Sequence, residues 1–143
     1  MEKPAVPKRI EHVGIAVSDL NAAIGVYEKL LGTPPYAVEE VADQHVRTAF
    51  FRVGESKIEL LESTSPDGPI AKFIAKRGEG IHHIAFALDD LRSALAGLAA
   101  GGSTLIDAAP RAGAEGLSIA FIHPGSACGV LTELTEDPRT AHG

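Results

Sequence analysis

The chain has 143 residues, of which 45% are hydrophobic and 22% charged, a composition typical of one soluble globular domain. Its net charge of −6 argues against general binding to nucleic acid, which requires a basic face. No signal peptide and no apolar run of membrane-spanning length is visible, and the single cysteine, Cys128, permits neither an intramolecular disulfide nor a thiolate metal cage, so we expect a cytoplasmic protein.

The first half of the chain predicts a strand, a helix and three further strands. Residues 10–17 alternate as in a strand, with His12 and two small residues on one face. The period then changes to that of a helix, which Asp19 can cap and Gly32 can end. Strand patterns follow at residues 38–41, 47–53 and 57–62, with a hairpin turn at 54–56, which gives the order βαβββ.

The second half predicts the same order after a connector. Residues 64–79 contain turn-forming residues and a short helix from Pro69 to Lys76. A strand is then predicted at residues 81–88 and a helix at 91–99, which Gly101-Gly102 ends. Three short strands are predicted near residues 104–106, 117–122 and 130–134.

The two halves also repeat each other in sequence. The segment His12-Val13-Gly14-Ile15-Ala16-Val17 returns as His83-Ile84-Ala85-Phe86-Ala87-Leu88, and Ile58-Glu59-Leu60-Leu61-Glu62 returns as Thr132-Glu133-Leu134-Thr135-Glu136. The interval from His to Glu is 47 residues in the first copy and 50 in the second, a difference that a longer turn at 124–129 accommodates. Each half therefore contributes one His and one Glu.

These four residues are the candidate metal ligands: His12, Glu59, His83 and Glu133. Strand parity places His83 on the same small-residue face as His12, and His82 on the opposite face. A His and a Glu at matching places in both halves are difficult to explain as solvated surface. Two imidazoles and two carboxylates without sulfur suit one divalent ion, with Co²⁺ favoured and Mn²⁺, Ni²⁺, Zn²⁺ or Mg²⁺ as alternatives, in an open site that leaves room for substrate.

The paired modules resemble the vicinal oxygen chelate superfamily, which includes glyoxalases and bleomycin resistance proteins, and within it the methylmalonyl-CoA epimerase family. The likeness covers about residues 9–136 and is most specific in His82-His83-Ile84 and in Gly129-Val130-Leu131-Thr132-Glu133-Leu134. It implies an α+β fold in which two paired βαβββ modules form a cup-shaped mixed sheet around a metal site. The expected single domain spans residues 1–143, with module one at 9–63, the connector at 64–79 and module two at 80–136.

The resemblance also implies an activity, the interconversion of the C2 epimers of methylmalonyl-CoA through a metal-stabilised enolate. By resemblance, the four candidate ligands fall on the family's metal positions, and Glu133 also transfers a proton. Some family members are thought to use an acidic residue where this chain has Thr48, so the second proton-transfer group is Thr48 as a relay, a water molecule or a shifted carboxylate. The expected partner is an acyl-CoA substrate, without nucleic acid or membrane, and the expected assembly is a homodimer.

Two other functions remain open at this point. The same scaffold and ligands resemble glyoxalase I, a lactoylglutathione lyase acting on a glutathione hemithioacetal. A metal-free ligand-sequestering module of the superfamily is the alternative from another class, and it would not need all four ligands. Among the remaining polar residues, His82 and His123 are expected to support the fold or to orient the ligands. Lys72, Lys76 and Arg77 are expected to form a solvated face or to meet CoA phosphates.

Overall fold

The computed structural model describes residues 6–140 and divides into two compact units. The first unit comprises residues 12–82, and the second comprises residues 83–140 with residues 6–11. The boundary between them falls inside the first strand. The described residues form a mixed α+β fold with three α-helices and eight β-strands.

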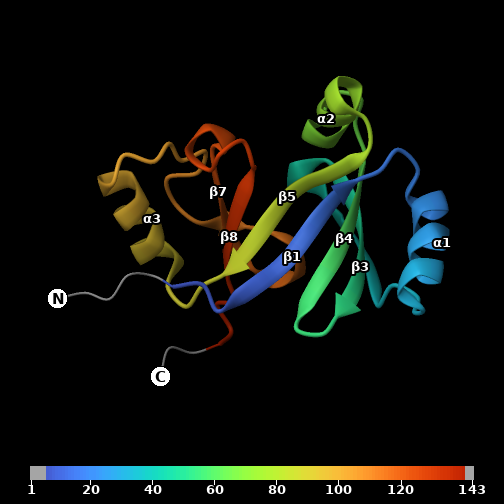
Figure 1. The fold of residues 1–143 in the computed structure, drawn as a ribbon, viewed down its shortest axis with the longest axis horizontal. Helices are drawn as coiled ribbons and strands as arrows, with labels where there is room; N and C mark the ends of the chain where they lie inside the picture. The colour runs from blue at the N-terminus through green and yellow to red at the C-terminus, as the bar shows by residue number, and fades with distance from the viewer. Residues whose placement is uncertain (1–5, 141–143) are drawn as a thin grey trace. The chain divides into compact units, whose positions relative to one another are not determined.

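The first unit contains a four-stranded mixed sheet, and the helix that follows the first strand packs on one face of it (Figure 1). Its strands are hydrogen-bonded in the order β2-β3-β4-β1, in which β1 and β4 are parallel and the other two pairs antiparallel. The elements are β1 (Arg9–Ala16), α1 (Leu20–Leu31), β2 (Ala37–Val41), β3 (Val46–Val53), β4 (Ser56–Ser63) and the connector helix α2 (Pro69–Arg77).

The second unit repeats this plan. Its strands follow the order β5-β8-β7-β6, with β5 and β8 parallel and the other two pairs antiparallel. The elements are β5 (Gly80–Ala87), α3 (Leu91–Ala100), β6 (Arg111–Ala112), β7 (Ser118–Ile122) and β8 (Thr132–Glu136). The predicted order βαβββ is therefore confirmed in both halves.

Two predicted strands differ from the structure. Residues 104–106 form no strand, and Leu105 makes only an isolated bridge to Ile122. The strand at that sheet edge is β6, because its two residues find partners in β7. The last strand begins at Thr132 instead of residue 130, since Cys128 and Gly129 both have positive φ values, 56° and 90°, and the backbone is still turning there.

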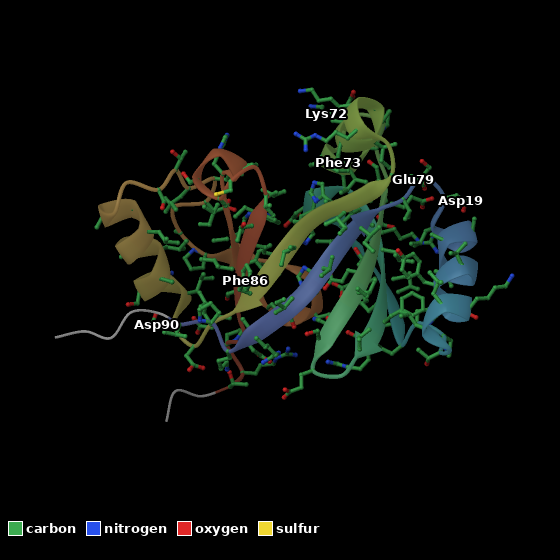
Figure 2. All side chains as sticks on the ribbon, in the orientation of Figure 1. Asp19, Lys72, Phe73, Glu79, Phe86 and Asp90 are labelled. Atoms are coloured by element: carbon green, nitrogen blue, oxygen red, sulfur yellow. The ribbon has the colours of Figure 1, made fainter. Side chains whose placement is uncertain are left out.

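Each main helix begins at an aspartate, as predicted for the first of them. The Asp19 carboxylate accepts a hydrogen bond from the Ala22 amide at 3.2 Å. The Asp90 carboxylate accepts one from the Ser93 amide at 3.0 Å. Figure 2 shows Asp19 and Asp90 at the starts of α1 and α3. These N-caps satisfy amides that have no partner inside the helix and so fix where each helix starts.

A second carboxylate caps each helix from a neighbouring strand. Glu62 at the end of β4 accepts a hydrogen bond from the Leu20 amide at 3.0 Å. Glu136 at the end of β8 accepts one from the Leu91 amide at 2.8 Å. The two glutamates occupy matching places in the sequence repeat, so each unit attaches its helix to its sheet in the same way.

Each of α1 and α3 covers one face of its four-stranded sheet, and α2 covers part of the opposite face in the first unit. In the first unit α1 packs on alternate residues of β1, β3 and β4, including Ala49, Phe51 and Leu60. In the second unit α3 packs on a cluster that includes Ala120, Ile122 and Leu134. Because side chains alternate along a strand, the residues between these positions lie on the opposite face, where in the first unit α2 packs on residues that include Ala16 and Leu61. That face carries the candidate ligands.

Candidate metal centre

In the first unit, His12 and Glu59 form a buried pair on adjacent parallel strands. Gly14 of β1 lies opposite Glu59 of β4, which places His12 one residue pair further along the same face. The Nδ1 atom of His12 lies 3.2 Å from an Oε2 oxygen of Glu59. The two predicted ligands of this half are therefore in contact.

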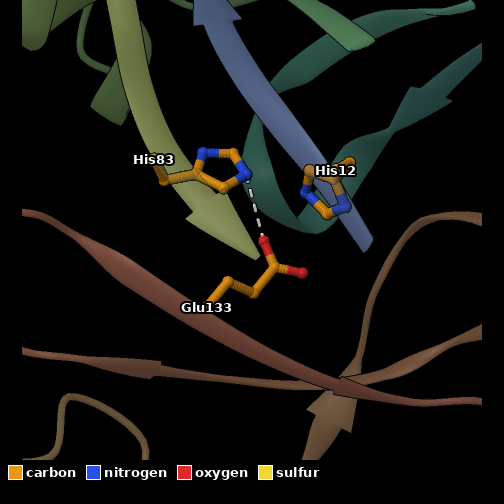
Figure 3. Close-up of side chains that lie close together, drawn as sticks. All are labelled: His12, His83 and Glu133. Atoms are coloured by element: carbon orange, nitrogen blue, oxygen red, sulfur yellow. Dashed lines mark ion pairs between the residues drawn. The ribbon is translucent and has the colours of Figure 1, made fainter. Parts of the chain in front are cut away.

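In the second unit, His83 and Glu133 form the corresponding pair. Ala85 of β5 lies opposite Glu133 of β8, so the diagonal relation of His to Glu is the same as in the first unit. The Nε2 atom of His83 lies 3.1 Å from Oε1 of Glu133, as the dashed line in Figure 3 shows. The sequence repeat is thus also a repeat of local geometry.

Burial and chemistry both fit these side chains to a cation. All four residues are at most 5% exposed. Burying a carboxylate costs free energy unless a cation or a hydrogen-bond donor contacts it, so the burial of Glu59 and Glu133 favours a cation site. Among residues 6–140, each of the four belongs to a group of three His and Glu side chains whose ligand atoms lie close enough together to hold a metal ion. The donor set, imidazole nitrogen and carboxylate oxygen without sulfur, suits a divalent transition metal.

Thr48, the fifth residue singled out in the sequence, is buried on the face of the first unit that carries His12 and Glu59. It lies in β3 two residues from Phe50, and Phe50 is the residue opposite Glu59. Directly across from Thr48 in β2 lies Glu39, a carboxylate that the sequence analysis did not single out. The structure therefore offers a shifted carboxylate beside the predicted hydroxyl.

Lys57 is a further charged residue that the sequence did not reveal. It is 4% exposed, and its Nζ atom lies 3.8 Å from Oε2 of Glu59. The same ammonium group lies over the ring of Phe50, 5.9 Å from its centroid. In the sequence, its role is indicated only by its position two residues before Glu59, because side chains two residues apart lie on the same face of a strand. Lys57 therefore adds positive charge next to a candidate ligand.

The residues expected to support the fold do so. The ring of His82 meets the ring of Phe73 in α2 edge-on at 5.0 Å. The Nδ1 atom of His123 accepts a hydrogen bond from the Gly125 amide at 2.9 Å and caps a short 3₁₀ turn. Cys128 is exposed in a turn. Lys72, Lys76 and Arg77 are exposed on α2, as a solvated face predicts.

None of the helices among the residues that the structure describes is long and apolar enough to cross a membrane.

Comparison with known proteins identifies relatives of this architecture. Residues 11–121 match the family model described as the Glyoxalase/Bleomycin resistance protein/Dioxygenase superfamily. An uncharacterized Bacillus subtilis protein, YqjC, is 42% identical over 94% of this chain and 96% of its own. The ethylmalonyl-CoA/methylmalonyl-CoA epimerase of Cereibacter sphaeroides is 36% identical over 90% of this chain and 97% of its own.

A solved structure gives the same result. A variant of the Streptomyces coelicolor methylmalonyl-CoA epimerase, in complex with 2-nitronate-propionyl-CoA, matches with a TM-score of 0.91 and 35% identity. The match covers 96% of this chain and 100% of that chain. These likenesses confirm the predicted fold class, a mixed α+β fold of this superfamily.

Proposed function

The chain belongs to the glyoxalase/bleomycin resistance protein/dioxygenase superfamily, and from that membership we propose that it is a metal-dependent epimerase acting on the C2 carbon of methylmalonyl-CoA. The observation that carries the proposal is the duplicated, buried His–Glu pair. The relatives that match about 90% of the chain include proteins named as epimerases of methylmalonyl-CoA and ethylmalonyl-CoA.

Both pairs, His12 with Glu59 and His83 with Glu133, would hold one divalent cation. That cation would supply Lewis acidity, which stabilises the negative charge of an enolate. Sharing of one ion by both pairs is part of the proposal. It rests on the repeat, on the equal burial of the four side chains and on the donor chemistry.

Inversion at C2 requires a proton to leave one face of the carbon and return to the other. Glu133 would take the proton on one face, because a buried carboxylate held by an imidazole is a positioned acid–base group. Thr48 would relay the proton on the second face, with a water molecule or the carboxylate of Glu39 as alternatives. Small residues beside the His–Glu pairs, Gly14 and Ala85, leave room for this.

The activity is tested by the exchange of deuterium from D₂O into the C2 position of methylmalonyl-CoA. We expect protein loaded with metal to exchange this hydrogen and to interconvert the two epimers. Glutathione hemithioacetal, assayed in parallel, is expected to remain unchanged. Turnover of the hemithioacetal without C2 exchange would replace the epimerase with a lactoylglutathione lyase. Absence of both reactions together with absence of bound metal would favour a ligand-sequestering module.

Removal of metal is expected to abolish activity reversibly. A chelator should remove about one divalent ion per chain, and Co²⁺ or Mn²⁺ should restore exchange because the proposed ligands are nitrogen and oxygen. Metal analysis and the exchange assay measure both effects. The matched control is Cys128→Ser, whose side chain is exposed in a turn and should leave metal content unchanged. Loss of metal from that variant would contradict the ligand set.

The predicted homodimer and cytoplasmic location stay predictions. Sedimentation of the purified protein would establish the first, and localisation of the full chain in cells the second.

A further inference from the structure

A guanidinium group lies one aromatic ring away from a proposed metal ligand in the second unit. The Cζ atom of Arg111 lies over the ring of Phe121, 5.5 Å from its centroid. The same ring meets the imidazole of His83 edge-on, with 5.6 Å between centroids. Phe121 is also the residue opposite Glu133 across β7 and β8. Arg111 is therefore close to the His83–Glu133 pair without being part of it.

Asp107 fixes the direction of this arginine. The Nε atom of Arg111 donates a hydrogen bond to Oδ1 of Asp107 at 3.0 Å, and the Phe121 amide donates one to Oδ2 at 2.9 Å. The Asp107 carboxylate thus bridges the Nε atom of Arg111 and the backbone of β7. Within residues 6–140, the two terminal amino groups of Arg111 make no hydrogen bond, and 41% of the side chain is exposed. Two parallel N–H donors are left in a defined orientation.

The first unit has a similar cation in a different arrangement. There Phe50 lies opposite Glu59, and the ammonium group of Lys57 lies over the ring of Phe50. That ammonium group contacts Glu59 itself at 3.8 Å and is buried. Arg111 instead contacts Asp107 through its Nε atom, and its side chain is partly exposed. Of these two cations, Arg111 is the one positioned to meet a ligand.

We propose that the terminal amino groups of Arg111 bind the free carboxylate of the acyl-CoA substrate. This inference rests on the proposed function and names the group that would select a dicarboxylic acyl chain. A planar guanidinium presents two parallel N–H bonds at the spacing of the two carboxylate oxygens, a match that lysine cannot provide. A phosphate of CoA has the same chemistry. We assign the acyl carboxylate because it belongs to the reacting end of the substrate, and only one ring separates Arg111 from His83.

The test compares two CoA esters that differ in one carboxylate. Calorimetric titration of the metal-loaded full chain with methylmalonyl-CoA and with propionyl-CoA measures binding without requiring turnover. We expect Arg111→Gln to weaken methylmalonyl-CoA binding about tenfold or more, the scale of a charge-assisted hydrogen bond, and to leave propionyl-CoA binding unchanged. Arg111→Lys should recover only part of the loss. In the exchange assay the change should appear mainly in KM.

The control and the contrary outcomes are specific. Arg92→Gln alters another exposed arginine of the same unit, in α3, and should affect neither ester. Equal losses for both esters would place a CoA phosphate at Arg111 and overturn the carboxylate assignment. No loss for either ester would overturn the site itself. If the wild-type protein binds neither ester, both the role of Arg111 and the proposed acyl-CoA substrate are wrong. If it binds methylmalonyl-CoA through Arg111 but shows no C2 exchange, only the epimerase proposal fails.

Discussion

Replacing Glu133 with glutamine is expected to lower C2 exchange by a factor of about 100 or more while most of the metal stays bound. The amide keeps an oxygen that can coordinate a cation, but it cannot accept a proton as a carboxylate does. Glu133 is buried and lies 3.1 Å from His83, so bulk water does not readily substitute for it. Deuterium incorporation and metal content, measured on the same preparation, separate the two effects.

Glu59→Gln is the matched comparison, because Glu59 occupies the equivalent place in the other unit. Its effect should be milder, since the proposal gives Glu59 only a metal-binding role. Near-normal exchange in Glu133→Gln with metal bound would refute the proton-transfer role of Glu133. Thr48→Val extends the comparison to the second face of the substrate. A small effect there would exclude a hydroxyl relay and direct attention to Glu39 or to water.

His12→Ala and His83→Ala are each expected to weaken divalent metal binding by more than about 100-fold. Removing a residue that only orients a ligand typically costs about 10- to 100-fold, so loss of a ligand should exceed that range. His82→Ala is the control: its ring packs on Phe73, and we expect a much smaller change. Competition against a coloured chelator measures all three affinities. Equal affinities would show that strand parity assigned the wrong histidines.

Much of the fold follows from short-range signals that the sequence displays. Asp19 and Gly32 predict the limits of α1 because each performs a local task, capping amides and adopting positive φ. The strand predicted at residues 104–106 is wrong for a different reason. Which segment pairs with β7 depends on a partner distant in the sequence, and the structure selects Arg111–Ala112. Local alternation cannot make that selection.

The candidate site also contains residues that the sequence predicted and residues that it did not. The two His–Glu pairs could be predicted because the repeat presents them twice and because parity assigns each to a face. Lys57 and Arg111 could not, since they do not occupy matching places in the repeat. Their roles depend on the cross-strand positions of Phe50 and Phe121. A long charged residue in a strand is usually solvated, and only the register shows that these two lie over aromatic rings.

The strand that carries each proposed ligand also carries the carboxylate that caps a helix three residues later. Glu59 precedes Glu62 in β4, and Glu133 precedes Glu136 in β8, with the two side chains of each pair on opposite faces. A cation bound at the proposed ligands would therefore raise the free energy of local unfolding at Leu20 and Leu91. We expect slower amide exchange at the starts of α1 and α3 in metal-loaded protein than in protein stripped of metal.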